Sequence, residues 1–239
     1  MKSGKSRLFR SSSEIPLRES LAPLTKLTAG LRKRRDLKRS PVPNVSRNAV
    51  FLNIPYDDKF RSLYLAYIVG LTHLGLEPRA TLGIPGGSRR LDRILDLVKS
   101  CRYSIHDLSR VQLERAAPRV PRFNMPFELG LAVTWSQLNP TRHTWFVCEA
   151  ENRRLLKSLS DLNGTDPNIH GGTVEGVMRE LGNAFVRDRA MPTVPRMMNA
   201  YRVVSRKAEE IQRDAGGQSL FEARTFNGLC FAARVAADL

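Results

Sequence analysis

The sequence RFNMPFELGLA, residues 122–132, marks the start of a helix. A polar turn leads into Pro126, and an apolar run with helical spacing follows. Proline is tolerated in a first helical turn because the N–H groups there have no partner within the helix. We expect Asn124 or Met125 to be the N-cap and Glu128 to lie in about the first turn, where the helix dipole favours an ionised carboxylate. Glu128 is therefore either a stabiliser of the helix end or a functional carboxylate.

Outward from this helix, apolar runs of two kinds alternate along the chain. Short β-branched or aromatic runs predict strands at residues 49–54, 77–82, 102–108, 143–149 and 159–162. Helical spacing of apolar residues predicts helices at residues 60–74, 91–100, 125–138, 152–159 and 173–185. This alternation is typical of a parallel sheet with helices on both faces. We expect a three-layer, flavodoxin-like, doubly wound α/β fold with strand order 2-1-3-4-5.

Three parts of the chain are predicted from these patterns. Residues 1–48 are expected to form a basic arm that is disordered or loosely helical. Residues 49–190 form the α/β domain, and residues 191–239 form a helical extension with helices at 194–214 and 220–237. The extension is expected either to pack on the domain or to mediate a homo-oligomer. Two single residues refine the picture: Gly75 is the expected C-cap of the first helix, and Pro78 favours an edge position for the second strand.

Composition places the chain among globular proteins. Of its 239 residues, 41% are hydrophobic, and no apolar run approaches the roughly 18 residues of a membrane-spanning helix. The first residues lack the apolar segment of a secretory signal, so we expect a cytoplasmic protein. Cys101, Cys148 and Cys230 are widely spaced and form no CxxC pair, which favours buried thiols over a zinc site or a disulfide framework.

The net charge of +16 is concentrated in the arm, because residues 1–48 contain 13 Lys or Arg residues and only three acidic ones. Such a segment can bind nucleic acid or an anionic membrane surface. It can equally be a solvated tail, or the result of a start codon placed too far upstream. Phe9 is its only aromatic residue, so stacking on nucleic-acid bases is poorly supported.

Polar residues follow several of the predicted strands. In an open parallel sheet, ligands bind at the carboxyl ends of the strands, beside the point where strand order reverses. Residues 53–58 follow the first strand, His106 and Asp107 end the third, Glu128 begins the next helix, and residues 161–170 follow the fifth strand. We therefore expect these side chains to converge on one rim of the sheet.

Three segments, in this order, resemble the superfamily that unites nucleoside 2-deoxyribosyltransferases with TIR domains. They are VFLNIPYDDKF at 50–60, SIHDLS at 104–109 and MPFELGLA at 125–132, where residues 128–132 match the E-x-G-x-A of the deoxyribosyltransferases. The glutamate of that motif attacks the anomeric carbon, so the resemblance implies this role for Glu128. The usual D-x-G-T before the glutamate is replaced here by Asn124-Met125-Pro126-Phe127, which leaves the substrate open.

The resemblance implies cleavage of an N-glycosidic bond at a ribose C1′, in NAD or in a related nucleotide or nucleoside. An oxocarbenium-like transition state is stabilised or captured by a carboxylate. Nicotinamide leaves NAD as a neutral ring, whereas a purine or pyrimidine needs an acid. The predicted catalytic residues are Glu128 and Asp107. The predicted substrate-binding residues are Asn53, Pro55, Tyr56, Asp57, Asp58, His106, Asn124 and Met125. No metal and no separate cofactor are expected.

Three functions from different classes remain open at this point. The first is an N-glycosidase such as an NAD glycohydrolase or a deoxyribosyltransferase-like enzyme. The second is a non-catalytic TIR-like nucleotide-sensing or assembly module that forms a homo-oligomer through its C-terminal helices. The third is a nucleic-acid-binding protein that uses the basic arm. The converging acids favour the first function.

Overall fold

The computed structural model describes residues 44–83, 89–111, 120–186 and 191–238. The chain divides into two units, Met1–Pro41 and Val42–Leu239, and the second contains every element described below. The first unit, with most of the predicted basic arm, lies outside the described residues. The predicted arm ended at Asn48, but β1 already begins at Ser46, because Ser46 pairs with Cys101.

Five strands form one sheet in the order β2-β1-β3-β4-β5, and every pairing is parallel. Their bounds are β1 Ser46–Asn53, β2 Glu77–Arg79, β3 Cys101–Asp107, β4 Thr144–Glu149 and β5 Asn168–Ile169. The predicted flavodoxin-like order is therefore confirmed. The short strand β2 is at the edge, as Pro78 predicted, because a residue without an N–H cannot serve a central strand.

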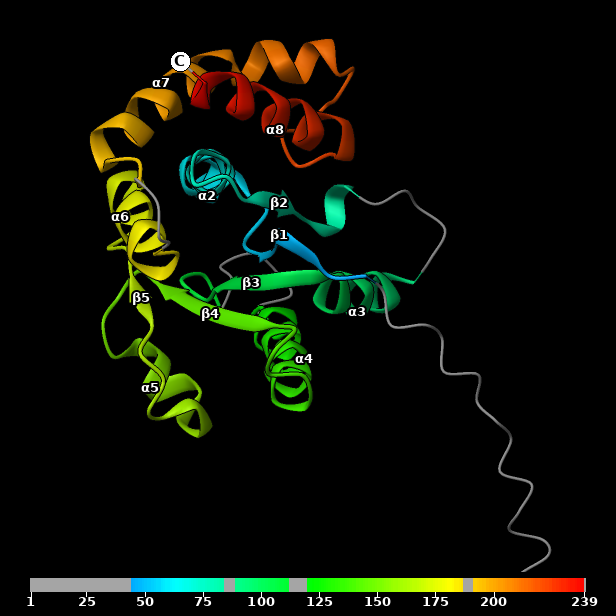
Figure 1. The fold of residues 1–239 in the computed structure, drawn as a ribbon, viewed down its shortest axis with the longest axis vertical. Helices are drawn as coiled ribbons and strands as arrows, with labels where there is room; N and C mark the ends of the chain where they lie inside the picture. The colour runs from blue at the N-terminus through cyan, green and yellow to red at the C-terminus, as the bar shows by residue number, and fades with distance from the viewer. Residues whose placement is uncertain (1–43, 84–88, 112–119, 187–190, 239) are drawn as a thin grey trace, which may run out of the picture. The chain divides into compact units, whose positions relative to one another are not determined.

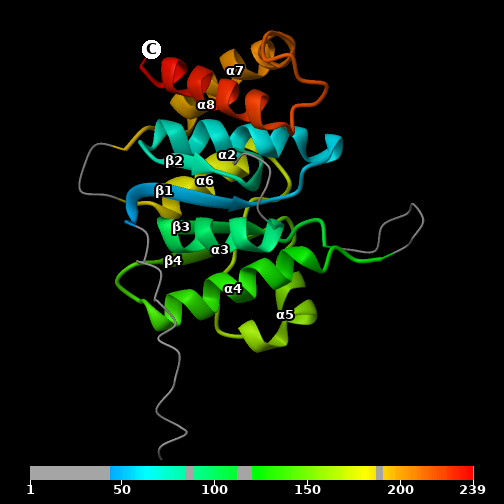
Figure 2. The same cartoon turned by 90° about the vertical axis from the view of Figure 1, so that its right-hand side faces the viewer.

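Helices cover both faces of the sheet. Their bounds are α2 Arg61–His73, α3 Arg90–Ser100, α4 Asn124–Leu138, α5 Arg154–Ser158, α6 Val174–Ala184, α7 Val194–Asp214 and α8 Ala223–Ala237. Figure 1 shows α2 and α6 beside one face and α3 and α4 beside the other. The view from the side in Figure 2 shows α7 and α8 as a further layer beyond α2.

Strand β1, the second strand of the sheet, is buried on both faces over residues 49–53, as parallel strands between helix layers are. Val50 and Leu52 belong to the core that α2 and α6 complete. Ala49 and Phe51 belong to a second core, which α3 and α4 cover. This explains why the strand reads as a continuous apolar run rather than as an alternating one.

Helix α2 is buried along its whole middle, over residues 63–72. The sheet covers one side of it, and α6, α7 and α8 pack against the others. A helix that is apolar all round needs such cover. Its end is a Schellman motif, in which the Leu76 N–H donates to Leu71 O and Gly75 has a φ of 68°. Gly75 is thus the C-cap glycine that the sequence predicted.

The C-terminal helices begin and end close to the predicted bounds. Met197, Val204 and Ala208 of α7, with Leu229 and Ala233 of α8, are buried in the same core cluster as α2. The extension therefore packs on the α/β domain and contributes to its core. Among the described residues, no helix combines the length and the apolar character that a membrane span requires. Cys101, Cys148 and Cys230 are buried free thiols, as expected.

The predicted fifth strand at residues 159–162 is wrong. Residues Ser160–Leu162 form a 3-10 helix, and the fifth strand is Asn168–Ile169, where a loop was expected. Leu159 and Leu162 pack beside Leu155 and Val147 in a small core, so their apolar character reflects packing and not a strand. The second strand is also shorter than predicted, because Thr81–Gly83 is a 3-10 turn.

Two glycines of α6 should respond in opposite ways to substitution by alanine. A Cβ at Gly176 would lie 1.9 Å from the backbone oxygen of His170, whereas one at Gly182 would meet no atom within 4 Å. Gly176→Ala should therefore lower the free energy of unfolding by about 3 kcal/mol. Gly182→Ala should raise it by about 0.5–1 kcal/mol, because alanine is the better helix former. Urea unfolding of the two variants measures this, and changes of the same sign would contradict the packing described.

Removal of residues 1–41 should leave the remaining unit folded, because Val42–Leu239 contains the whole sheet and its cores. Its thermal unfolding midpoint should match that of the full chain within about 2 °C, on the order of half a kcal/mol. Removal of residues 1–48 is the matched comparison and should be clearly destabilising, because it takes away the start of β1. Equal unfolding midpoints for the two deletions would show that the Ser46 end of β1 contributes nothing to stability.

Candidate functional site

A cavity of about 320 Å³ lies where β1 and β3 end and α4 begins. Its walls come from segments that are far apart in the sequence but meet at this rim. The lining residues are Asn53, Ile54, Pro55, Tyr56, Thr81, Arg90, Arg122, Asn124, Met125 and Glu128. The structure therefore brings together six of the predicted site residues, namely Asn53, Pro55, Tyr56, Asn124, Met125 and Glu128.

Glu128 is the fifth residue of α4 and is only 3% exposed. The predicted N-cap was wrong, because Phe123 takes that place and the Phe127 N–H donates to Phe123 O at 3.1 Å. Glu128 consequently lies one residue beyond the first turn. A role as a helix-end cap is thereby weakened, while a role in the cavity is favoured.

Burial raises the pKa of Glu128, because a carboxylate loses hydration in the protein interior. Two neighbours act in the opposite direction. The Arg90 guanidinium lies 3.7 Å from Oε1 and lowers the pKa, and Asn124, one helical turn earlier, lowers it as well. The pKa stays above its ordinary value, so the site contains a carboxylate that is held close to a cation but is incompletely solvated.

Asn53 is fixed in the cavity wall by two hydrogen bonds. Its Nδ2 group donates to Met125 O at 3.0 Å and to His106 Nδ1 at 3.0 Å. Both amide hydrogens are thereby used, and Oδ1 is the polar group that Asn53 has left for a ligand. Since Met125 O belongs to α4 and His106 to β3, this one side chain also links the helix to the sheet.

His106 is fully buried and does not line the cavity. It belongs to a chain of hydrogen bonds, which continues from His106 Nε2 to Ser104 Oγ at 2.9 Å, then to His143 Nε2 at 2.9 Å, and ends at Cys101 O. Donors and acceptors can be assigned along this chain in only one way, because the Asn53 amide nitrogen at one end can only donate and Cys101 O at the other end can only accept. His106 is then protonated at Nε2 and His143 at Nδ1.

Both histidines of this chain are neutral. Burial, together with the neighbouring His143, lowers the pKa of His106 to about 3. Burial likewise lowers the pKa of His143. A proton added to His106 would have no place at Nδ1, which already accepts from Asn53. The predicted role of His106 in binding substrate is therefore replaced by one in holding Asn53.

Asp107 lies away from the cavity, although it was predicted beside Glu128. Side chains of successive strand residues point to opposite faces, so His106 faces α4 while Asp107 faces α2. Asp107 is fully buried, accepts from Tyr67 Oη at 2.8 Å, and caps Ser109 through its N–H at 2.9 Å and its hydroxyl. His170 Nε2 is 3.1 Å from Oδ2, but without the alignment of a good hydrogen bond.

Asp57 and Asp58 also stay outside the cavity wall. Asp57 is the N-cap of a 3-10 turn, where Oδ1 accepts from Phe60 N at 3.2 Å. Its Oδ2 accepts from Arg122 Nη1 at 2.8 Å and from Arg110 Nε at 3.1 Å. Asp57 thus acts on the cavity indirectly by holding Arg122, whereas Asp58 is exposed.

Arg90, Arg122 and Thr81 line the cavity but were not among the predicted site residues. Arg90 is the first residue of α3. Its position was available from topology, because a helix that follows a strand begins at the carboxyl edge of the sheet. A buried carboxylate such as Glu128 also needs a cation nearby, and an arginine at the start of α3 can supply it.

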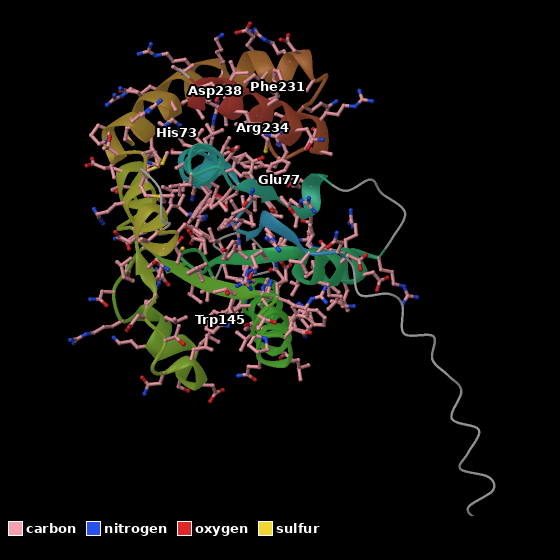
Figure 3. The ribbon with its side chains drawn as sticks, viewed as in Figure 1. His73, Glu77, Trp145, Phe231, Arg234 and Asp238 are labelled. Carbon is pink, nitrogen blue, oxygen red and sulfur yellow. The ribbon has the colours of Figure 1, made fainter. Side chains whose placement is uncertain are left out.

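A second cavity, of about 470 Å³, lies between β2, α3 and α8. Figure 3 shows Glu77 of β2 below Phe231 and Arg234 of α8, all of which line it. None of the predicted site residues is among its lining residues. We therefore take the cavity beside Glu128 as the candidate site.

Comparisons with protein-family models, with curated proteins and with solved structures found no match.

The buried histidine chain should make folding stability depend on pH. The folded pKa of His106 is about 3 and its ordinary value is 6.5, so its contribution is complete above pH 6.5 and is lost as the pH falls toward 3. The loss is about 1.4 kcal/mol per pH unit. His106→Asn should be less stable than the parent at pH 8, and the difference should shrink by about that slope between pH 6 and pH 4. Urea unfolding at several pH values measures it; a difference that is independent of pH would contradict a neutral His106.

Proposed function

We propose that this chain cleaves the N-glycosidic bond at a ribose C1′ of NAD or a related nucleotide, with Glu128 as nucleophile or oxocarbenium stabiliser. One observation carries the proposal: the Glu128 carboxylate is buried in a cavity at the carboxyl end of β1, the strand that pairs with β3. In doubly wound sheets this is the place where ligands bind. The resemblance of the segments at 50–60, 104–109 and 125–132 to deoxyribosyltransferases and TIR domains supports the same chemistry.

The surroundings of Glu128 suit stabilisation of a developing positive charge. A carboxylate in a poorly solvated site interacts with an oxocarbenium ion more strongly than it would in water. Burial deprives the carboxylate of hydration and so raises its pKa, and the same loss of hydration lets the ionised form gain more from a neighbouring cation than a fully solvated carboxylate does. The Asn53 Oδ1 atom can accept a hydrogen bond from a ribose hydroxyl and so orient the ring.

The acids that line the cavity favour one kind of leaving group. Among the described residues that line it, Glu128 is the only carboxylic acid, since Asp57, Asp58 and Asp107 lie elsewhere. A purine or pyrimidine would need a second acid to protonate it as it leaves. Nicotinamide needs none, because the pyridinium of NAD departs as a neutral ring. The composition of the cavity thus favours NAD or another pyridinium nucleotide.

The alternative is a non-catalytic nucleotide-sensing or assembly module of TIR-like type. It is favoured by exposed apolar side chains, because Phe123 and Phe127 at the start of α4 are 69% and 56% exposed. Phe231 and Val235 of α8 are exposed as well and offer a surface for the proposed homo-oligomer through the C-terminal helices. Nucleic-acid binding through the basic arm concerns residues that are mostly outside the described ones.

Glu128→Gln should abolish turnover while leaving the fold intact. The change keeps the size of the side chain and removes the charge, so release of nicotinamide from NAD should fall by on the order of 10³-fold or more. Stability should be unchanged or slightly higher, because a buried carboxylate with a raised pKa is replaced by a neutral amide. The assay incubates the full chain with NAD and with a nucleoside panel and follows free nicotinamide or base.

Glu210→Gln is the matched control, because Glu210 is an exposed residue of α7. It should leave the rate at the parental value. The parental rate should also rise with pH through the raised pKa of Glu128, since only the ionised carboxylate is active. A Glu128→Gln protein that releases nicotinamide at the parental rate would refute the proposed function.

A further inference from the structure

Two arginines face the same cavity as Glu128. Arg90 begins α3 and Arg122 lies just before α4, so two segments that are distant in the sequence place a guanidinium group at one rim. The proposed cleavage needs the carboxylate but does not by itself need either cation. The two arginines therefore point to a function in addition to the cleavage itself.

Charged side chains meet in two places around the cavity. The Asp57 carboxylate contacts both Arg110 and Arg122. Arg90 is 3.7 Å from Glu128, and its side chain is 54% exposed. At that distance Arg90 and Glu128 form an ion pair but not a bidentate hydrogen-bonded pair. A guanidinium has five N–H donors, so Arg90 keeps donors for another partner. Arg90 can thus contact Glu128 and a second anion together.

The direction of α4 also favours an anion in the cavity. Asn124 and Met125, the first two residues of the helix, line the cavity, and the positive end of the helix dipole is therefore close to it. The asparagines and Thr81 in the wall are neutral. An anion that enters next to Arg90 and Arg122 meets a field that attracts it, and Glu128 is the one described lining residue that opposes it.

We propose that Arg90 and Arg122 form a phosphate-binding subsite, so that the ligand of this cavity is a phosphorylated nucleotide and not a nucleoside. The planar guanidinium fork matches phosphate oxygens and binds them through paired hydrogen bonds. Asp57 holds Arg122 in place before the ligand arrives, which lowers the entropy lost on binding. The proposal deepens the function given above and rests on it for the reaction, but binding can be measured without turnover.

The test compares ligands that differ only by the phosphate. Isothermal titration calorimetry on the full-length Glu128→Gln protein, which should not turn the ligand over, uses AMP against adenosine and nicotinamide mononucleotide against nicotinamide riboside. In at least one pair the nucleotide should bind 10-fold or more tightly than the nucleoside. Adding Arg90→Gln or Arg122→Gln should remove most of that difference. Adding Arg206→Gln, an exposed arginine of α7, changes the net charge equally and should leave it intact.

Two further measurements serve as controls. Arg122→Gln also breaks the contact with Asp57, so Arg122→Lys is made beside it, and thermal unfolding shows that each variant is folded. The lysine retains a charge without the fork and should bind the nucleotide with intermediate affinity. Inorganic phosphate is the third ligand, and it should bind far more weakly than the nucleotide.

Equal affinity for nucleotide and nucleoside in both pairs, including no binding by either, would overturn the subsite. Arginine variants that bind like Arg206→Gln, or inorganic phosphate that binds as tightly as the nucleotide, would overturn it too. These failures differ from failure of the proposed reaction. Phosphate-dependent binding without cleavage would refute the reaction and keep the subsite, whereas equal cleavage of nucleotides and nucleosides would keep the reaction and refute the subsite.

Discussion

The parallel pairing of β1 with β3 is the constraint on which the rest of the structure depends. It places Asn53 opposite His106 and ends both strands at the same edge. Because a strand alternates its side chains between faces, the consecutive residues His106 and Asp107 are committed to opposite layers. The pairing therefore decides at once that Asn53 is held beside α4 and that Asp107 is enclosed against α2. The cavity exists because α4 starts just beyond this edge.

On the two faces of β3, buried polar groups find their hydrogen-bond partners in different ways. On the side of α4, the chain from Asn53 to Cys101 O is neutral, which avoids the desolvation of a charge. On the side of α2, the buried Asp107 is surrounded by donors from Tyr67 and Ser109. Arg154 then fixes the loop that follows, through Ser109 O at 2.7 Å and an ion pair with Glu149.

The sequence was sufficient for the sheet order and for most of the cavity wall, because apolar periodicity and strand ends are local signals. It was insufficient where a decision depended on packing. Leu159 and Leu162 resembled a strand because a small core needs them, and Asp107 resembled a partner of Glu128 because sequence does not show which face a strand residue takes. The N-cap at Phe123 lacks a polar side chain and so gave no signal. Arg90 and Arg122 could be placed in the cavity wall only once the topology of the sheet was known.

The fixed direction of the histidine chain gives the cavity a polarity of its own. Since both amide hydrogens of Asn53 are engaged by Met125 O and His106, the amide cannot turn over to suit a different ligand. Asn53 Oδ1 can therefore accept only from a group that donates, such as a hydroxyl, while the guanidinium groups favour groups that accept. A ligand with both kinds of group would be held by both and so be oriented. The main-chain oxygen of Cys101, buried in β3 at the other end of the hydrogen-bond chain, would thereby help to orient a ligand that it does not touch.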